Sequence, residues 1–274
     1  AIHVWAGQGS GTAVISAFGA TNSEIFSGLT SLGTTTGKVI AINETLVGTT
    51  ANLIFATDSN TAYFFPDGGA FTTISDADFP GNVAGETITG GFVFLNGYAF
   101  ILTESGKLYN SDLNSLSAWT ASSFLSTNMS PDKGIGLSRY KDFVVAFGKE
   151  SVEFFAGADN PSGVSPLKRV DQGYIRIGCA SETAYAQLDD TVAWLGTTPN
   201  SGVGIYMLEG LQAKRVSTST IEALLGTANI STMRLNCIKI LGKTFIIVVA
   251  VSDARTYVYC VEDELWHEWA STTI

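Results

Sequence analysis

Residues 91–123 read GFVFLNGYAFILTESGKLYNSDLNSLSAWTASS, and this stretch decides the fold. It alternates short runs of aromatic, aliphatic and β-branched residues, which suit a half-buried pleated surface, with pairs of turn residues. Asn96-Gly97 and Ser105-Gly106 predict tight turns, because Asn and Gly tolerate the positive φ that a two-residue hairpin requires. Four short antiparallel strands cannot bury both of their faces. The stretch therefore predicts a unit that packs against similar units.

The same pattern of apolar strand, turn and apolar strand recurs along the chain at spacings of 40 to 53 residues. The recurrences start near Gly9, Thr49, Asn96, Tyr140, Leu188 and Leu241. A repeat of ~40–50 residues with four strands is typical of a β-propeller blade. We therefore predict an all-β fold, a single β-propeller domain over residues 1–274 with six four-stranded blades. One or two β-sandwiches are the competing fold, although a sandwich does not predict so regular a period.

Local patterns assign some residues to positions in this fold. Residues 38–42 are expected to close the first blade, and the second blade is expected to begin near Thr45. The sequence STSTIEALL, residues 217–225, predicts a short connector helix that is capped by Ser217 or Ser219 and ended by Gly226. Five large apolar residues are expected to be buried between blades: Phe100, Trp119, Phe147, Trp194 and Val248.

Composition describes a turn-rich β protein with a large core. Of the 274 residues, 45% are hydrophobic, 15% are charged and 29 are glycine. No apolar run approaches the ~18 residues of a membrane-spanning helix, so we expect no membrane association. The N-terminal sequence lacks the basic and apolar regions of a signal peptide, and we expect a processed chain or a piece of a longer polypeptide.

Residues that carry chemistry are scarce. His3 and His267 are the two histidines, and no nucleophile elbow, P-loop or HExxH motif is present. The glycines at 7, 9 and 11 do not have the dinucleotide-binding spacing and predict a tight turn instead. Asp76 and Asp78 lack the spacing of a calcium loop and predict a solvated acidic loop. We therefore predict no catalytic residues, no cofactor-binding residues, no metal site and no enzymatic activity.

The cysteines and two glutamates leave alternatives open. Cys179, Cys237 and Cys260 have no CxxC spacing and predict buried free thiols in a protein assembled in a reducing cytoplasm. A bridge between Cys237 and Cys260, which belong to one predicted blade, is the alternative. Glu150 and Glu153 flank a hairpin, and a glycosidase needs two carboxylates across a sugar site. The Ser-x-Asp-x-Gly-x-x-Trp boxes of sialidase propellers are absent, however.

Several segments together resemble the tail-hub or nozzle proteins of short-tailed bacteriophages, also called packaged-DNA stabilisation proteins. The resemblance covers residues 91–225 and preserves order and spacing. Its segments are TESGKLYNSDLNSLSAW (103–119), FGKESVEFFAGAD (147–159), GCA (178–180), LDDTVAWLG (188–196) and RVST (215–218) before Ile221-Glu222. Members of the family usually carry additional sequence before the propeller-like region, and that sequence is not recognisable in this chain.

The resemblance implies a structural virion protein that is assembled in the host cytoplasm. It implies a ring of identical subunits, a hexamer, below the portal and its adaptor, which retains packaged DNA and conducts it during ejection. The implied partners are other copies of the chain, the portal-adaptor protein, distal tail proteins and passing double-stranded DNA. The alternative is a carbohydrate-binding or glycoside-hydrolysing propeller, and a third possibility is a propeller scaffold for protein partners.

The charge pattern bears on how such a protein would meet DNA. Fifteen Lys and Arg against 25 Asp and Glu give a net charge of −10, and the basic residues are scattered. A protein that grips DNA shows a basic stripe, whereas an acidic wall repels a moving polyanion and prevents sticking. The acids available for such a wall lie in predicted loops: Asp76, Asp78, Glu150, Asp189, Asp190, Glu262, Asp263 and Glu264.

Overall fold

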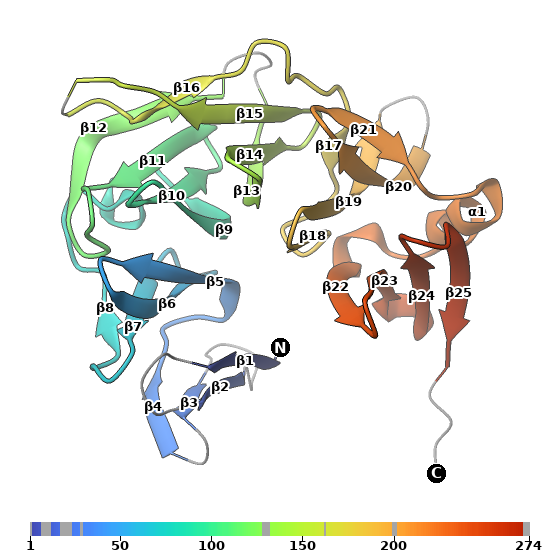
Figure 1. Cartoon of the computed structure of the whole chain (residues 1–274), viewed down its shortest axis with the longest axis horizontal. Helices are drawn as coiled ribbons and strands as arrows, with labels where there is room; N and C mark the ends of the chain where they lie inside the picture. The colour runs from blue at the N-terminus through green and yellow to red at the C-terminus, as the bar shows by residue number, and fades with distance from the viewer. Residues whose placement is uncertain are drawn as a thin grey trace. The chain divides into compact units, whose positions relative to one another are not determined.

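The computed structural model describes residues 2–6, 12–16, 24–27, 30–127, 132–161, 163–198 and 202–270. Two compact units make up the chain. The first comprises residues 1–127 with 157–168, and the second comprises residues 128–156 with 169–274. Both units consist mainly of antiparallel sheets in which strands adjacent in sequence pair with one another (Figure 1).

The first unit contains three four-stranded runs. The first run is β1 (Ile2–Ala6), β2 (Thr12–Ser16), β3 (Glu24–Ser27) and β4 (Thr30–Thr34). The second is β5 (Val39–Val47), β6 (Thr50–Thr57), β7 (Ala62–Pro66) and β8 (Thr72–Thr73), followed by the short 3₁₀ helix η1 (Pro80–Asn82). The third is β9 (Ile88–Leu95), β10 (Tyr98–Thr103), β11 (Lys107–Ser111) and β12 (Trp119–Ser126).

The second unit continues the same pattern. It contains β13 (Gly134–Tyr140), β14 (Phe143–Gly148) and β15 (Val152–Gly157), and β16 (Leu167–Arg169) follows in sequence. The next sheet has β17 (Gly178–Cys179), β18 (Tyr185–Leu188), β19 (Thr191–Thr198), β20 (Gly202–Glu209) and β21 (Gln212–Arg215). After helix α1 (Ser219–Thr227) and η2 (Ile230–Thr232) come β22 (Arg234–Ile240), β23 (Lys243–Ala250), η3 (Val251–Asp253), β24 (Arg255–Cys260) and β25 (Leu265–Trp269).

The same two-residue turn recurs five times in these sheets. It joins β5 to β6, β9 to β10, β13 to β14, β18 to β19 and β22 to β23, and its first residue always has a positive φ of 50–59°. Those first residues are Gly48, Asn96, Lys141, Asp189 and Leu241. The repeat starts predicted from Thr49 onward fall on or next to these turns, so the recurrence is confirmed. The start near Gly9 lies outside the described residues, and both the number of blades and the single-domain boundary stay predictions.

One strand departs from its expected place. Residues 38–42 were expected to close the first blade, but Val39–Val47 form a single nine-residue strand that pairs with β6. The expectation is wrong because the polar residues in the middle of β5 resemble a strand boundary, although they belong to one continuous ladder.

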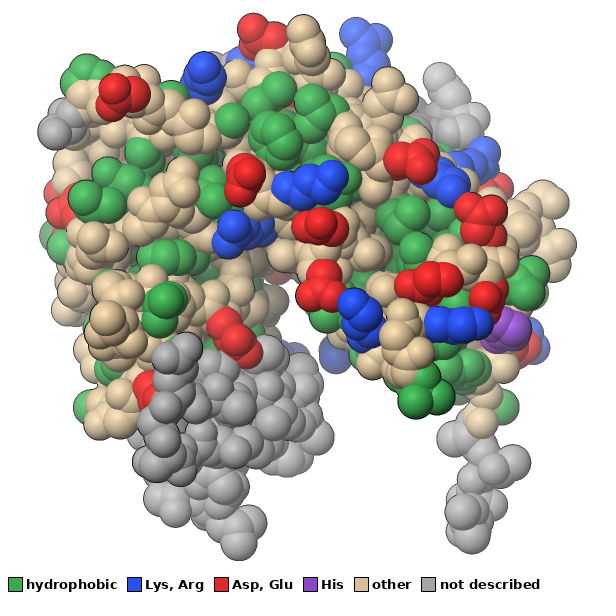
Figure 2. Space-filling model, in the orientation of Figure 1, with side chains coloured by type: hydrophobic (Ala, Val, Ile, Leu, Met, Phe, Trp, Pro, Cys, Tyr) green, Lys and Arg blue, Asp and Glu red, His purple; other side chains and the backbone are tan. Residues whose placement is uncertain are grey.

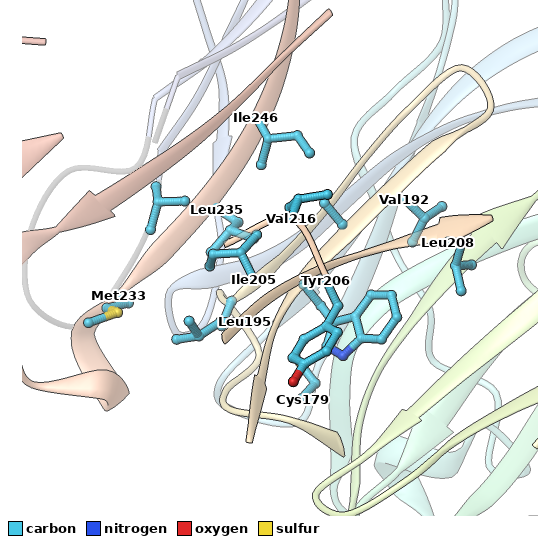
Figure 3. Close-up of a cluster of buried hydrophobic side chains, with 14 of the residues drawn as sticks. Cys179, Val192, Leu195, Ile205, Tyr206, Leu208, Val216, Met233, Leu235 and Ile246 are labelled. Carbon is cyan, nitrogen blue, oxygen red and sulfur yellow. The ribbon is translucent and has the colours of Figure 1, made fainter. Parts of the chain in front are cut away.

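The predicted large residues are buried. In the first unit Phe100 and Trp119 are 1% and 4% exposed, and the Trp119 ring meets Phe79 edge-on with ring centroids 5.1 Å apart. In the second unit Phe147, Trp194 and Val248 are fully buried. Figure 3 shows part of this second core, where Leu195, Ile205, Val216 and Leu235 gather in one cluster.

The connector helix is confirmed, but both of its predicted ends are wrong. Helix α1 is capped by Thr218, whose Oγ1 accepts the Ile221 backbone N–H at 3.4 Å. The Ser217 hydroxyl serves the adjoining sheet instead, because it accepts the Ile205 N–H at 3.0 Å and donates to Glu222 at 2.5 Å. Gly226 lies inside the helix, which continues to Thr227.

The position of Gly226 leads to a prediction about stability. An ideal Cβ at this residue meets no other atom within 4 Å, and the backbone is helical. Alanine costs less backbone entropy than glycine in a helix, so we expect Gly226→Ala to raise the free energy of unfolding by about 0.5–1 kcal/mol. Equilibrium unfolding in urea measures the change. A destabilised variant would contradict the assignment of Gly226 to the helix.

Candidate interaction surface

Turns from three sheets of the second unit come together at one end of those sheets. We call these residues the turn surface: 139–142, 187–190, 209–214, 239–243 and 261–265. A hydrogen bond and two ion pairs tie the sheets to each other at this end. The Gly210 N–H donates to the Tyr140 hydroxyl at 3.1 Å, Lys239 Nζ lies 3.2 Å from Asp189 Oδ2, and Lys214 Nζ lies 2.7 Å from Glu264 Oε1.

Three lysines on the turn surface are each paired with an acidic side chain. Lys243 Nζ donates to both carboxylate oxygens of Asp263, at 2.8 and 2.6 Å, and this hydrogen bond holds the pKa of Asp263 below its ordinary value. The hydrogen bond from Lys214 lowers the pKa of Glu264 in the same way. Figure 2 shows acidic and basic side chains interleaved over the second unit. These pairs are exposed, so they contribute little to stability and mainly balance the local charge.

The predicted acids of the second unit do not all lie at one end of their sheets. Asp189, Asp190, Glu262, Asp263 and Glu264 lie on the turn surface. Glu150 lies at the other end of β14, in the turn before β15.

Asp76 and Asp78 belong to the first unit, in a turn that ends at η1. The Asp76 carboxylate accepts the backbone N–H groups of Trp119 at 3.1 Å and of Asp78 at 2.9 Å. The loop is partly exposed, and the Asp76 carboxylate also fixes the start of β12 through its hydrogen bond to Trp119.

An open cleft of ≈ 530 Å³ lies on the turn surface between β13–β14 and β18–β19. Its lining carries both signs of charge: Arg139, Lys141, Asp142, Gln187, Asp189 and Asp190. The Gln187 side-chain amide oxygen accepts the backbone N–H of Arg139 at 3.1 Å, and this hydrogen bond fixes one wall of the cleft. A mixed lining of this kind suits a polar protein segment better than a polyanion, because phosphates would meet carboxylates as well as ammonium groups.

Three exposed apolar residues of the turn surface were missed by sequence reasoning. Leu241 is fully exposed, Ile240 is 42% exposed and Leu265 is 56% exposed. Leu241 also has a φ of 50°, a conformation that a leucine adopts only at an energetic cost. The available signal was the Leu-Gly pair, because the equivalent turns elsewhere begin with Gly, Asn, Lys or Asp.

Candidate catalytic groups are occupied in structural contacts. The Glu153 side chain is buried, and its Oε2 accepts from Arg169 Nε at 2.7 Å. His267 is exposed on β25, and the side chain of His3 lies outside the described residues. Among the residues with described side chains, no group of three or more His, Cys, Asp or Glu is arranged to hold a metal ion. The glycine turn at 7, 9 and 11 lies outside the described residues.

The three cysteines are free. The alternative bridge is wrong, because Cys237 on β22 and Cys260 on β24 are separated by β23, which pairs with both strands. Burial raises the pKa of Cys179 and of Cys237 to about 12, so these thiols stay protonated at neutral pH. Protonated thiols are poor nucleophiles and poor metal ligands.

The chain matches a known protein family over most of its length. The family model Phage_stabilise, described as bacteriophage P22 Gp10, beta-propeller, matches residues 29–271. No curated protein matches the sequence. Among the described residues, no helix is long and apolar enough to cross a membrane.

Solved structures share the fold at low sequence identity. The extracellular domain of the putative one-component system BT4673 from B. thetaiotaomicron gives a TM-score of 0.58 at 12% identity, over 99% of this chain and 33% of that one. BBS1N in its complex with ARL6DN gives 0.57 at 14% identity, over 98% and 81%. The computationally designed protein Ika8 gives 0.54 at 13% identity, over 97% and 74%. These similarities concern the fold alone.

Proposed function

Because this chain belongs to the phage stabilisation family, described as bacteriophage P22 Gp10, beta-propeller, we propose that it is a tail hub or nozzle of a short-tailed phage. In this role it forms a ring of identical subunits, a hexamer, below the portal and adaptor, retains the packaged DNA and conducts it during ejection. It is a component of the virion, assembles in the host cytoplasm and has no enzymatic activity. The family match over residues 29–271 carries the proposal.

Charge pairing on the turn surface supports passage of DNA without tight binding. Lys214, Lys239 and Lys243 each contact a carboxylate, so these ammonium groups are already neutralised by neighbours. A phosphate would have to compete with that carboxylate, and little counterion release would be gained. The net charge of −10 adds a general repulsion that is screened over the ~8 Å Debye length of physiological salt.

Charge reversal at two matched exposed acids tests the conduit role. Asp190 lies on the turn surface. Glu150 lies in the β14–β15 turn, at the end of β14 that is opposite to the turn surface. A Lys in place of an acid that faces the DNA adds one cation per subunit and lets the ring bind phosphates. We therefore expect either Asp190→Lys or Glu150→Lys, but not both, to slow genome ejection and make its rate more sensitive to salt.

The readouts are the ejection rate from particles that carry each variant and the affinity of the purified protein for linear duplex DNA. Tight retention of DNA by the unmodified protein at ~0.15 M salt would contradict passage without binding. Unchanged ejection in both variants would leave the acids without a role in conduction. Native mass spectrometry of the purified protein tests the hexamer separately.

A further inference from the structure

The turn between β14 and β15 is unusual in that three consecutive backbone N–H groups converge on one carboxylate. Asp132 Oδ1 accepts the N–H of Lys149 at 3.0 Å, and this N–H is shared with the Lys133 carbonyl oxygen, also at 3.0 Å. Asp132 Oδ2 accepts the N–H of Glu150 at 2.7 Å and the N–H of Ser151 at 2.9 Å. The Ser151 hydroxyl donates to the same oxygen at 3.1 Å. Four donors therefore surround one anionic group.

The backbone of this turn has the character of an anion-binding nest. Successive N–H groups that point into one concavity present partial positive charges, and such concavities bind phosphates, sulfates and carboxylates in many proteins. Hydrogen bonds to an ionised acceptor are shorter and stronger than neutral ones. The turn lies within FGKES, residues 147–151, one of the segments on which the family resemblance rests.

The glycine at the start of the turn makes room for the anion. An ideal Cβ at Gly148 would lie 2.2 Å from Asp132 Oδ2 and 2.8 Å from its Cγ. The φ of Gly148 is outside the left-handed region, so the backbone itself would accept alanine. The methyl group of an alanine would therefore occupy the place of the carboxylate oxygen, and the absence of a side chain at 148 is part of the site.

We propose that residues 148–151 form a carboxylate-binding nest whose resident ligand is the chain's own Asp132. Asp132 lies two residues before β13, so the ligand fixes the end of the preceding connection to the β14–β15 hairpin. The nest is a property of the backbone and not of Asp132. It will therefore accept a small external carboxylate once the aspartate side chain is removed.

Chemical rescue tests this proposal. We expect Asp132→Ala to lower Tm by about 5–10 °C, because four donors lose a charged acceptor. Sodium formate should then raise Tm in a saturable way, since a ligand that binds the folded state stabilises it according to its concentration and Kd. Sodium chloride at equal ionic strength should not reproduce the effect.

Two further variants separate the nest from a general salt effect. Asp132→Ala combined with Gly148→Ala fills the site with a methyl group, so its Tm should not respond to formate beyond the response to chloride. Asp112→Ala removes an exposed carboxylate that accepts the Thr120 hydroxyl at 2.9 Å, and it should show no specific response to formate. If Asp132→Ala does not fold in chloride, the yield of refolding in formate against chloride replaces Tm.

The outcomes decide between a nest and an ordinary loop contact. An unchanged Tm in Asp132→Ala would show that the four hydrogen bonds carry no net stability. Equal responses to formate and chloride, or equal formate rescue in the double variant, would show that the backbone groups do not form a carboxylate site. Each of these results overturns the proposal.

Discussion

Replacement of Trp194 with alanine should lower the free energy of unfolding by about 3–5 kcal/mol, a cost expected for removing a large buried aromatic ring. Trp194 is fully buried. Its ring stacks on Tyr206 with centroids 5.8 Å apart and lies 5.8 Å from the ring of Phe147. These neighbours come from β20 and β14, so the cavity would affect two sheets of the second unit at once.

Two control variants make the measurement specific. Trp269→Ala removes the same side chain from a site that is 42% exposed, and we expect a cost of roughly 1 kcal/mol or less. Trp194→Phe keeps most of the apolar volume and removes the indole N–H, which has no hydrogen-bond partner in the described part of the chain. It should therefore cost clearly less than alanine. Equilibrium unfolding in guanidinium chloride gives the three values, and equal costs at 194 and 269 would contradict this account of the core.

Replacement of Gly178 with alanine should lower the free energy of unfolding by more than the small size of a methyl group suggests. An ideal Cβ on Gly178 would lie 2.0 Å from the Lys149 carbonyl oxygen, 2.1 Å from its carbon and 2.3 Å from the Glu150 nitrogen. These are backbone atoms of the β14–β15 turn, which cannot rotate away as a side chain can. We expect Gly178→Ala to cost about 3 kcal/mol or more, at the upper end of overpacking effects.

Gly210 is the control for Gly178, because its backbone conformation and not a close contact favours glycine. Gly210 has a φ of 64°, but its ideal Cβ meets nothing within 4 Å. Gly210→Ala should therefore cost only the backbone strain, roughly 1 kcal/mol. Thermal unfolding of both variants shows the difference. If Gly178→Ala proves as stable as the unmodified protein, the backbone of the β14–β15 turn does not pack against Gly178 at the distances given above.

The repeat could be predicted because turn chemistry and strand composition are local properties. Asn96-Gly97 is a turn in the structure as it is in the sequence pattern, and the aromatic residues of the flanking strands are buried. The ends of α1 could not be predicted in the same way. Ser217, Thr218 and Ser219 are all acceptable caps, and the choice depends on the Ile205 N–H, which recruits the Ser217 hydroxyl from a strand 12 residues away.

The surface was less accessible to sequence reasoning than the core. The acids were recognised individually, but the partners of Asp189 and Glu264 are lysines 50 residues away in sequence. Counting charges in the sequence gives a net excess of acidic residues. The structure shows that several of these acidic side chains are neutralised by a nearby lysine. The capture of Asp132 by three backbone N–H groups has no signature in residue types, because backbone donors are common to nearly every residue.

The 50-residue separation of those ion pairs is about one structural repeat, and other contacts share it. Trp266 Nε1 donates to the Val216 carbonyl, and the Thr183 hydroxyl donates to the Met233 carbonyl, each across 50 positions. All four contacts join the part of the chain around β17–β21 to the part around β22–β25, so they hold one boundary between two successive sheets. Another repeat in place of the last one would present different side chains at this boundary and would lose these contacts. The last sheet is thus matched to the sheet before it and is not an interchangeable module.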